Sequence, residues 1–250
     1  MMERKVRIRI WAVLFWLLIW QLASMAIGSD ILLVSPLLVL RRLLELMMEN
    51  SFWQSIVFSL IRIAGGFFMA TVAGCLLAAF SSRCRFVCEL LAPLVLAIKT
   101  VPVASFIILA LIWFSSRNLA VFISFLMVFP VIYTNVFNGI AEVDRELLEM
   151  AEIFEIPTGR RIRYIYLPQL LPYFRAACTV ALGLCWKSGI AAEVIGMPDG
   201  SIGERLQQAK VYLDTPDLFA WTLVIVVVSL IFERVFLTLL DVIRLRLERM

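Results

Sequence analysis

The sequence predicts an all-α, polytopic membrane protein with about six transmembrane helices, and three observations lead to this class. Of the 250 residues, 62% are hydrophobic and only 17% are charged, whereas soluble domains are about 45–50% apolar and about 25% charged. The mean hydropathy is +0.95. The apolar residues gather in runs of about 20, the length of a membrane-spanning helix. This composition excludes both a single soluble core and intrinsic disorder, which requires low hydrophobicity.

Six apolar runs are the predicted spans. In chain order they cover residues 10–27, 55–80, 98–114, 119–138, 171–195 and 218–240. The first run follows a basic N-terminus and could be a signal peptide. Its length and its three tryptophans favour an uncleaved helix.

Residues 36–50 predict an amphipathic helix that lies at the membrane interface. Leucines recur there at helical spacing while charged residues face elsewhere, and Ser35-Pro36 is a favourable helix start. We expect one domain over residues 1–250, with its core in 55–245. Helices 10–27 and 36–50 are accessory elements.

The distribution of Lys and Arg predicts that both termini are cytoplasmic. With this orientation, 15 of the 23 Lys and Arg residues lie in inner segments and 5 in outer segments, as the positive-inside rule requires. Because these charges are spread over every inner loop, we do not expect a nucleic-acid-binding patch.

Histidine is absent, which excludes a histidine general base and imidazole metal ligands. Four of the five cysteines lie in or beside apolar runs, and their spacing does not predict a zinc site. We therefore expect free, buried thiols, no metal centre and no catalytic residue. The cysteines are Cys75, Cys84, Cys88, Cys178 and Cys185.

A polar segment, residues 142–168, separates the fourth and fifth runs. Charged and apolar residues alternate at helical spacing from Asp144 to Phe154, and Leu147, Leu148, Ala151 and Phe154 form the predicted apolar face. Pro157-Thr158-Gly159 breaks this helix, and a basic helix then leads back to the membrane. Such a protruding helix can insert into the groove of a partner or can simply connect two spans.

This segment resembles the EAA loop of ABC-importer permeases, written E-A-A-x3-G-x9-I-x-L-P. The matching residues are Glu149, Met150, Ala151, Glu155, Ile165, Leu167 and Pro168, with Met150 in place of an alanine and Glu155 in place of the glycine. Glycine at such a corner permits a positive φ, which Glu disfavours. We therefore expect Gly159 or the break at Pro157 to form the corner instead.

A second stretch extends the resemblance to the nitrate/sulfonate/taurine-type branch of these permeases. It comprises Trp186–Gly196, Gly200–Glu204 and Tyr212–Trp221. The resemblance implies a subunit that acts as a homodimer, with two cytoplasmic ABC ATPase subunits and an external solute-binding protein, in a bacterial inner membrane. The residues implied in coupling to the ATPase are Glu149, Met150, Ala151, Phe154, Glu155, Gly159, Leu167 and Pro168.

No cofactor is expected on this chain. The stretch Gly183–Ser188 lacks the glycine and the spacing of a phosphate-binding loop, so ATP and Mg would be held by the partner ATPase. The predicted function is therefore transport without covalent chemistry.

Charged residues inside the predicted spans are the candidate pathway. Arg or Lys costs about 2.5–3.5 kcal/mol at the centre of a membrane helix, so these residues should face protein or water. They line an anion pathway or form structural ion pairs, and both interpretations stay open. The candidates are Lys99, Pro102, Lys187 and Glu193, with Arg62 as a further intramembrane charge.

The expected cargo is a small sulfonate-, nitrate- or taurine-like anion, and a thiamine-precursor-like heterocycle is the alternative. An ion-coupled secondary transporter is a weaker candidate, because Glu193 is the one acidic residue well inside the predicted spans. An intramembrane enzyme would need an acid, base or metal set that the sequence does not supply.

Overall fold

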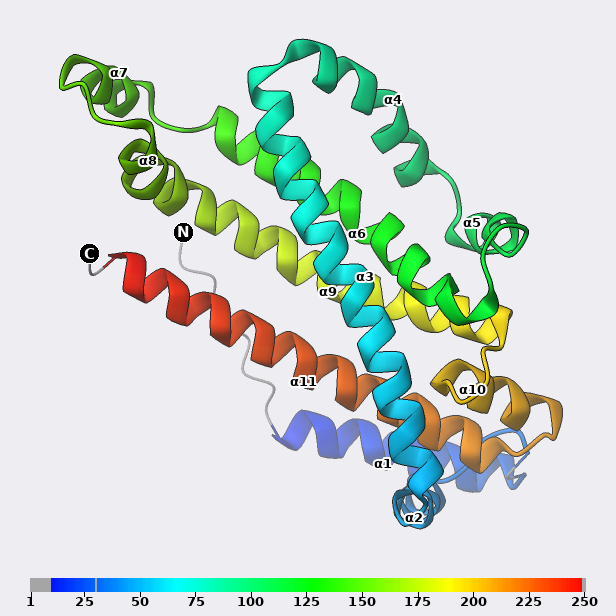
Figure 1. Cartoon of the computed structure of the whole chain (residues 1–250). Helices are drawn as coiled ribbons and strands as arrows, with labels where there is room; N and C mark the ends of the chain where they lie inside the picture. The colour runs from blue at the N-terminus through cyan, green and yellow to red at the C-terminus, as the bar shows by residue number, and fades with distance from the viewer. Residues whose placement is uncertain (1–9, 30, 249–250) are drawn as a thin grey trace.

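The computed structural model describes residues 10–29 and 31–248, and these residues form helices and connecting turns without a strand (Figure 1). Arg4, Lys5, Arg7, Arg9 and Arg249, which contribute to the charge asymmetry, lie outside the described residues. The α-helices are α1 (Ile10–Ile27), α2 (Pro36–Met47), α3 (Asn50–Arg83), α4 (Arg85–Thr100), α5 (Val103–Ala110), α6 (Ser116–Ala141), α7 (Arg145–Ile153), α8 (Thr158–Arg161), α9 (Leu167–Gly196), α10 (Ile202–Val211) and α11 (Thr215–Glu248). A π-helical turn, Ile162–Tyr166, joins α8 to α9.

Within residues 10–29 and 31–248, five helical segments are long and apolar enough to cross a membrane, or six if the bent pair α4–α5 counts as one span. They confirm the predicted spans at 10–27, 55–80, 119–138, 171–195 and 218–240 within a few residues at most ends. The segment that contains α9 differs most, because it is helical from Thr158 to Gly196. The chain is therefore a multi-pass membrane protein.

The predicted third span, residues 98–114, is wrong as a single helix. Helices α4 and α5 meet there at 105°. Val101 has an extended backbone, with φ −77° and ψ 133°, because the ring of Pro102 disfavours the helical conformation of the residue before it. Pro102 then serves as the N-cap of α5.

The core of the molecule forms where α6 packs between α3 and α9 (Figure 1). Small residues allow this close approach. A Cβ on Gly66 of α3 would lie 2.8 Å from the Ser124 Cβ of α6, and one on Gly189 of α9 would lie 2.7 Å from the Ser124 Oγ. The three helices thus cross around Ser124, which is fully buried.

The two accessory helices lie beside α11. The Trp20 indole of α1 donates a hydrogen bond to the Val34 carbonyl and packs on Phe219. Helix α2 begins as predicted, because the Ser35 hydroxyl accepts a hydrogen bond from the Leu38 amide. Its Arg42 forms an ion pair with Asp217 of α11.

All five cysteines are free thiols, and Cys178 and Cys185 are buried as expected. Cys75 and Cys88 are partly buried, whereas Cys84 is exposed. The expectation of burial is wrong for Cys84, because this residue forms the turn between α3 and α4.

Candidate functional site: the coupling segment and the membrane charges

Helix α7 projects at one end of the long helices, while α2 and α10 lie at the opposite end (Figure 1). The Asp144 carboxylate caps it by accepting a hydrogen bond from the Glu146 amide at 2.9 Å. The Asp144 amide in turn donates to the Gln169 side chain of α9 at 3.0 Å. The Asp144 side chain is therefore bonded to α7, and its backbone amide is bonded to α9.

A small apolar cluster holds α7 against the start of the next helical segment. Its buried members are Val143, Ala151 and Ile165, and Leu148, Ile156 and Tyr166 pack around them. Ala151 is 0% exposed, so no larger side chain fits there without moving the helix. This burial explains why an alanine occupies that position.

Glu155 forms the corner after α7, so the expectation that Gly159 or the Pro157 break would do so is wrong. Glu155 has φ +49°. Its amide donates to the Glu152 carbonyl at 3.0 Å, and the Ile156 amide donates to the Ala151 carbonyl at 2.9 Å. These two bonds around a left-handed residue make a Schellman motif. Gly159 is instead an ordinary residue of α8.

The apolar residues of α7 and of its C-cap Phe154, which include Met150 and Ile153 besides the predicted face, divide into two parts. Leu148 and Ala151 contact the rest of the chain, while the exposed residues of the second part form what we call the α7 tip. These are Leu147 (37% exposed), Met150 (43%), Ile153 (78%) and Phe154 (72%). Glu149 is also exposed. Because apolar side chains are exposed on a helix that the chain holds firmly, the α7 tip is suited to a partner.

The last two residues predicted in coupling lie where α9 begins. Leu167 and Pro168 are exposed first residues of this helix. Pro168 has no amide hydrogen to continue the regular ladder. The preceding turn is π-helical, with the Leu167 amide bonded to the Ile162 carbonyl. The predicted basic helix that leads back to the membrane is confirmed, with this π turn inside it.

Lys99 and Pro102 lie together at the bend between α4 and α5. The Lys99 side chain is exposed, and its Nζ lies 3.4 Å from the Thr134 hydroxyl of α6. Pro102 is exposed as well. The bend thus places one cation beside a helix break on the surface of this subunit.

Lys187 and Glu193 occupy different environments although both lie on α9. Lys187 is exposed and has no hydrogen bond or ion pair to a described residue. Glu193 is 0% exposed. Its Oε2 accepts hydrogen bonds from the Ser59 hydroxyl at 2.7 Å and from the Gly203 amide at 3.2 Å. Glu193 therefore fastens α9 to α3 and to the first turn of α10.

Sequence reasoning missed three residues of these sites. Ser59 also accepts the Ile202 amide at 3.0 Å, so it links α3 to α10, but a lone serine in an apolar run gives no such signal. Gly203 has no room for a side chain, because a Cβ would overlap Glu193. Ile153 could have been found, since it lies one turn beyond Met150 on the α7 tip.

Among the described residues, no group of three or more His, Cys, Asp or Glu side chains converges as a metal site would.

Comparison with known proteins assigns these features to a family. Residues 10–249 match the model described as "Binding-protein-dependent transport system inner membrane component". An Escherichia coli protein named as an aliphatic sulfonates transport permease is 31% identical over 235 residues, which cover 93% of this chain and 86% of that protein. A Bacillus subtilis protein of the same name is 28% identical, covering 84% of this chain and 77% of that protein. The nitrate import permease protein NrtB of Synechococcus elongatus is 28% identical, covering 75% and 70%.

Proposed function

We propose how this chain carries out transport, starting from the fact that it belongs to the family of inner-membrane components of binding-protein-dependent transport systems, the ABC-importer permeases. This membership implies cytoplasmic ATPase subunits and a solute-binding protein as partners. The finer points are our proposal: a homodimer, cytoplasmic termini, no catalysis by this chain, and ATP and Mg held by the ATPase.

The observation that carries the proposal is the α7 tip. Ile153 and Phe154 are 78% and 72% exposed, although the helix that bears them is fixed by a buried alanine, a capped start and a Schellman corner. A rigid helix with an exposed apolar end can insert into a groove on a partner. We therefore assign the coupling contact to Met150, Ile153 and Phe154, with Glu149 at its edge.

The coupling segment can transmit movement because both of its ends continue into the core. Helix α6 leads into α7, and α8 continues through the π turn into α9. Helices α6 and α9 pack on each other at the centre of the molecule. Closure of the ATPase dimer would therefore shift α6 and α9 as bodies, which is alternating access by rigid-body motion.

The exposed cation on α9 favours a small anion as the cargo. Lys187 is an exposed cation on a membrane-spanning helix, and exposure to lipid would cost about 2.5–3.5 kcal/mol. We infer that its face of α9 meets the second permease copy, where Lys187 lines the pathway. The relatives named for sulfonate and nitrate transport agree with an anion of this size.

ATP-dependent uptake by the purified chain, reconstituted with its ATPase and binding protein, tests this function. We expect labelled alkanesulfonate or nitrate to accumulate in vesicles only when ATP is present on the ATPase side. Replacing Lys187 with Met should lower this uptake about tenfold, because the pathway loses its cation, while the ATPase still copurifies.

Replacing Arg117 with Met is the matched control, since it removes an exposed cation from the start of α6. It should lower uptake less than Lys187→Met does. Uptake that is equal in wild type and Lys187→Met would disprove the pathway role of Lys187. Failure of any ATP-dependent uptake would contradict the importer function itself.

A further inference from the structure

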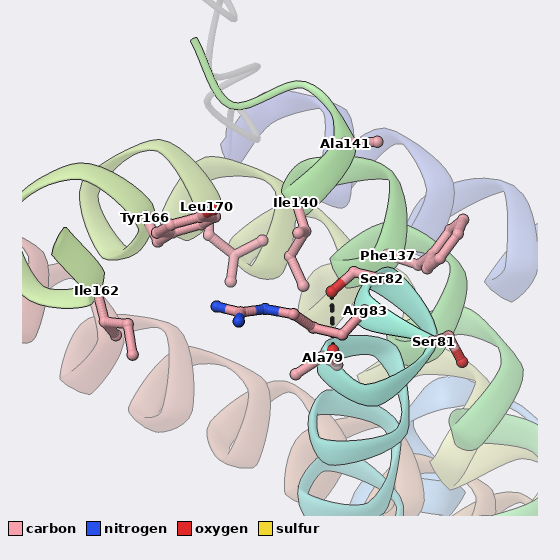
Figure 2. Close-up of a pocket in the computed structure, with 10 residues that line it drawn as sticks. All are labelled: Ala79, Ser81, Ser82, Arg83, Phe137, Ile140, Ala141, Ile162, Tyr166 and Leu170. Carbon is pink, nitrogen blue, oxygen red and sulfur yellow. Dashed lines mark hydrogen bonds between the residues drawn. The ribbon is translucent and has the colours of Figure 1, made fainter. Parts of the chain in front are cut away.

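A pocket of about 460 Å³ lies between the ends of α3, α6 and α9, at the end of the molecule that carries α7 (Figures 1 and 2). None of the residues assigned above to coupling or to the pathway lines it. The lining residues come from α3 (Ala79, Ser81, Ser82, Arg83), from α6 (Phe137, Ile140, Ala141) and from the π turn and α9 (Ile162, Tyr166, Leu170).

Arg83 is the only charged residue among these ten lining residues. Figure 2 shows its guanidinium extending across the pocket from α3 toward Tyr166 and Leu170. The guanidinium makes no hydrogen bond or ion pair with a described residue. The pocket therefore carries one positive charge that the described part of the chain does not neutralise.

The two serine hydroxyl groups of the pocket form hydrogen bonds with groups other than the Arg83 guanidinium. The Ser81 hydroxyl accepts a hydrogen bond from the Tyr133 hydroxyl at 3.0 Å. The Ser82 hydroxyl donates to the Ala79 carbonyl at 2.8 Å, as drawn in Figure 2. A guanidinium has five N–H donors in a planar fork that matches the oxygens of a phosphate, sulfonate or carboxylate.

Arg83 and the neighbouring Arg85 are both exposed, but they differ in their partners. Arg85 lies two residues further on, its side chain is 92% exposed, and it pairs with Glu89 at 2.8 Å. Arg83 also ends a helix whose C-terminal dipole favours a cation. That interaction does not explain why the guanidinium reaches between two other helices.

The walls of the pocket are apolar apart from Arg83 and the hydroxyl groups. Ile140, Ile162 and Leu170 lie around the guanidinium (Figure 2), and Phe137 lines the pocket further away. Arg83 is exposed, so the pocket is open on one side. Its apolar walls accept hydrocarbon next to the anionic group. An anionic head group with a short apolar portion fits both features.

We propose that this pocket is a binding site for an oxyanion group, a phosphate or a sulfonate, held by Arg83 between α3, α6 and α9. The bound group joins α3 to the two helices that continue into the coupling segment. Ile162 and Tyr166 are the first and last residues of the π turn, and π turns recur at functional sites. The site rests on the proposed function only for its location on the cytoplasmic side.

Two sources present this chemistry: the head group of an anionic lipid and a free anion in the cytoplasm. Thermal unfolding of the purified full chain in nanodiscs separates them. One arm compares phosphatidylcholine discs with discs that contain phosphatidylglycerol. The other arm titrates inorganic phosphate into phosphatidylcholine discs. We expect a rise in Tm in at least one arm, and the responding arm identifies the source.

Arg83→Gln should weaken this response about tenfold or more, because a charge-assisted pair is lost. Arg85→Gln removes the same charge outside the pocket and should keep the wild-type response. Ala79→Phe fills the pocket while it retains Arg83 and should abolish the response. If Arg83→Gln does not fold, Ala79→Phe alone tests whether the anion binds in this pocket.

Equal responses in wild type, Arg83→Gln and Ala79→Phe would overturn the proposal, as would no response in either arm. These results are independent of transport. Uptake can fail while Arg83-dependent binding persists, which contradicts only the importer function. Normal uptake without such binding contradicts only this site.

Discussion

Residues of the candidate site lie in opposite environments at the two ends of α9. Near its C-terminal end, Glu193 is 0% exposed, and Ser59 and Gly203 satisfy one of its oxygens. Before its N-terminal end, α7 is fixed by buried contacts yet exposes Ile153 and Phe154. Glu193 makes its contacts within one chain, although its other oxygen, Oε1, has no hydrogen-bond partner among the described residues. The α7 tip is left exposed. Burial within one chain therefore separates residues that hold the fold from the exposed residues that we propose to meet a partner.

The largest effect should follow from a charge on the α7 tip. Replacing Phe154 with Asp places a carboxylate in the proposed apolar contact, and hot-spot residues of this kind contribute about 2–4 kcal/mol to association. We expect ATPase retention in pull-down to fall at least about thirtyfold. The Tm of the isolated permease should stay unchanged, because Phe154 is 72% exposed.

Phe86 offers a matched control for this substitution. It is also 72% exposed, and it lies in the first turn of α4 rather than on α7. Phe86→Asp should leave ATPase retention close to that of wild type. Equal retention by Phe154→Asp and wild type would show that the α7 tip is not the docking contact.

A substitution at the Glu193 site should have the opposite effect. It should lower the stability of the permease without weakening its binding to the ATPase. Ser59→Ala removes the donor to Glu193 and the acceptor of the Ile202 amide. Removing one partner of a buried polar group costs about 1–3 kcal/mol, although the Gly203 amide still donates to Glu193. We expect a lower Tm in thermal unfolding of the purified permease and unaltered ATPase retention by the folded fraction.

Ser55→Ala is the control for this variant. Ser55 is equally buried and lies one turn earlier on α3, but its hydroxyl donates only to the Ser51 carbonyl within the same helix. Ser55→Ala should lower the free energy of unfolding by less than about 1 kcal/mol. If Ser59→Ala is as stable as Ser55→Ala, Glu193 does not fasten α9 to α3 and α10.

How far the sequence could predict these sites depends on whether the deciding contacts are local. Five of the six predicted spans, the Ser35 start of α2 and the capped start of α7 depend on neighbouring residues and were predictable, whereas the third span was wrong as a single helix. Ser59 lies 134 residues from Glu193, and nothing in either local pattern indicates their contact. Arg83 was similarly counted as one of many inner-loop charges, because only the packing of three helices creates its pocket.

The prediction of the corner residue after α7 was wrong for a different reason. Glycine preference is a statement about energy, and left-handed geometry costs an L-residue only about 1–2 kcal/mol. The two Schellman hydrogen bonds and the burial of Ile156 against Ala151 offset that cost. A rule based on residue type therefore predicted the wrong residue, while the spacing of the motif identified Glu155 correctly.

The smallest predicted effect tests this corner directly. Glu155→Gly relieves the positive φ, and the greater flexibility of glycine in the unfolded chain offsets part of the gain. We expect a stabilisation of up to about 1 kcal/mol, seen as slower hydrogen exchange of the Ile156 amide, which bonds across the corner. Glu155→Val should act in the opposite direction, since a β-branched residue is strongly disfavoured at positive φ.

Gly159→Ala completes the test, because it distinguishes the two corners. Gly159 lies in α8, and a Cβ there would meet nothing within 4 Å, so alanine should stabilise the helix by up to about 1 kcal/mol. If Gly159 formed the corner, alanine would instead destabilise it and speed the exchange of Ile156. Such a loss would contradict the assignment of the corner to Glu155, and with it the view that α7 is held rigid up to its exposed tip.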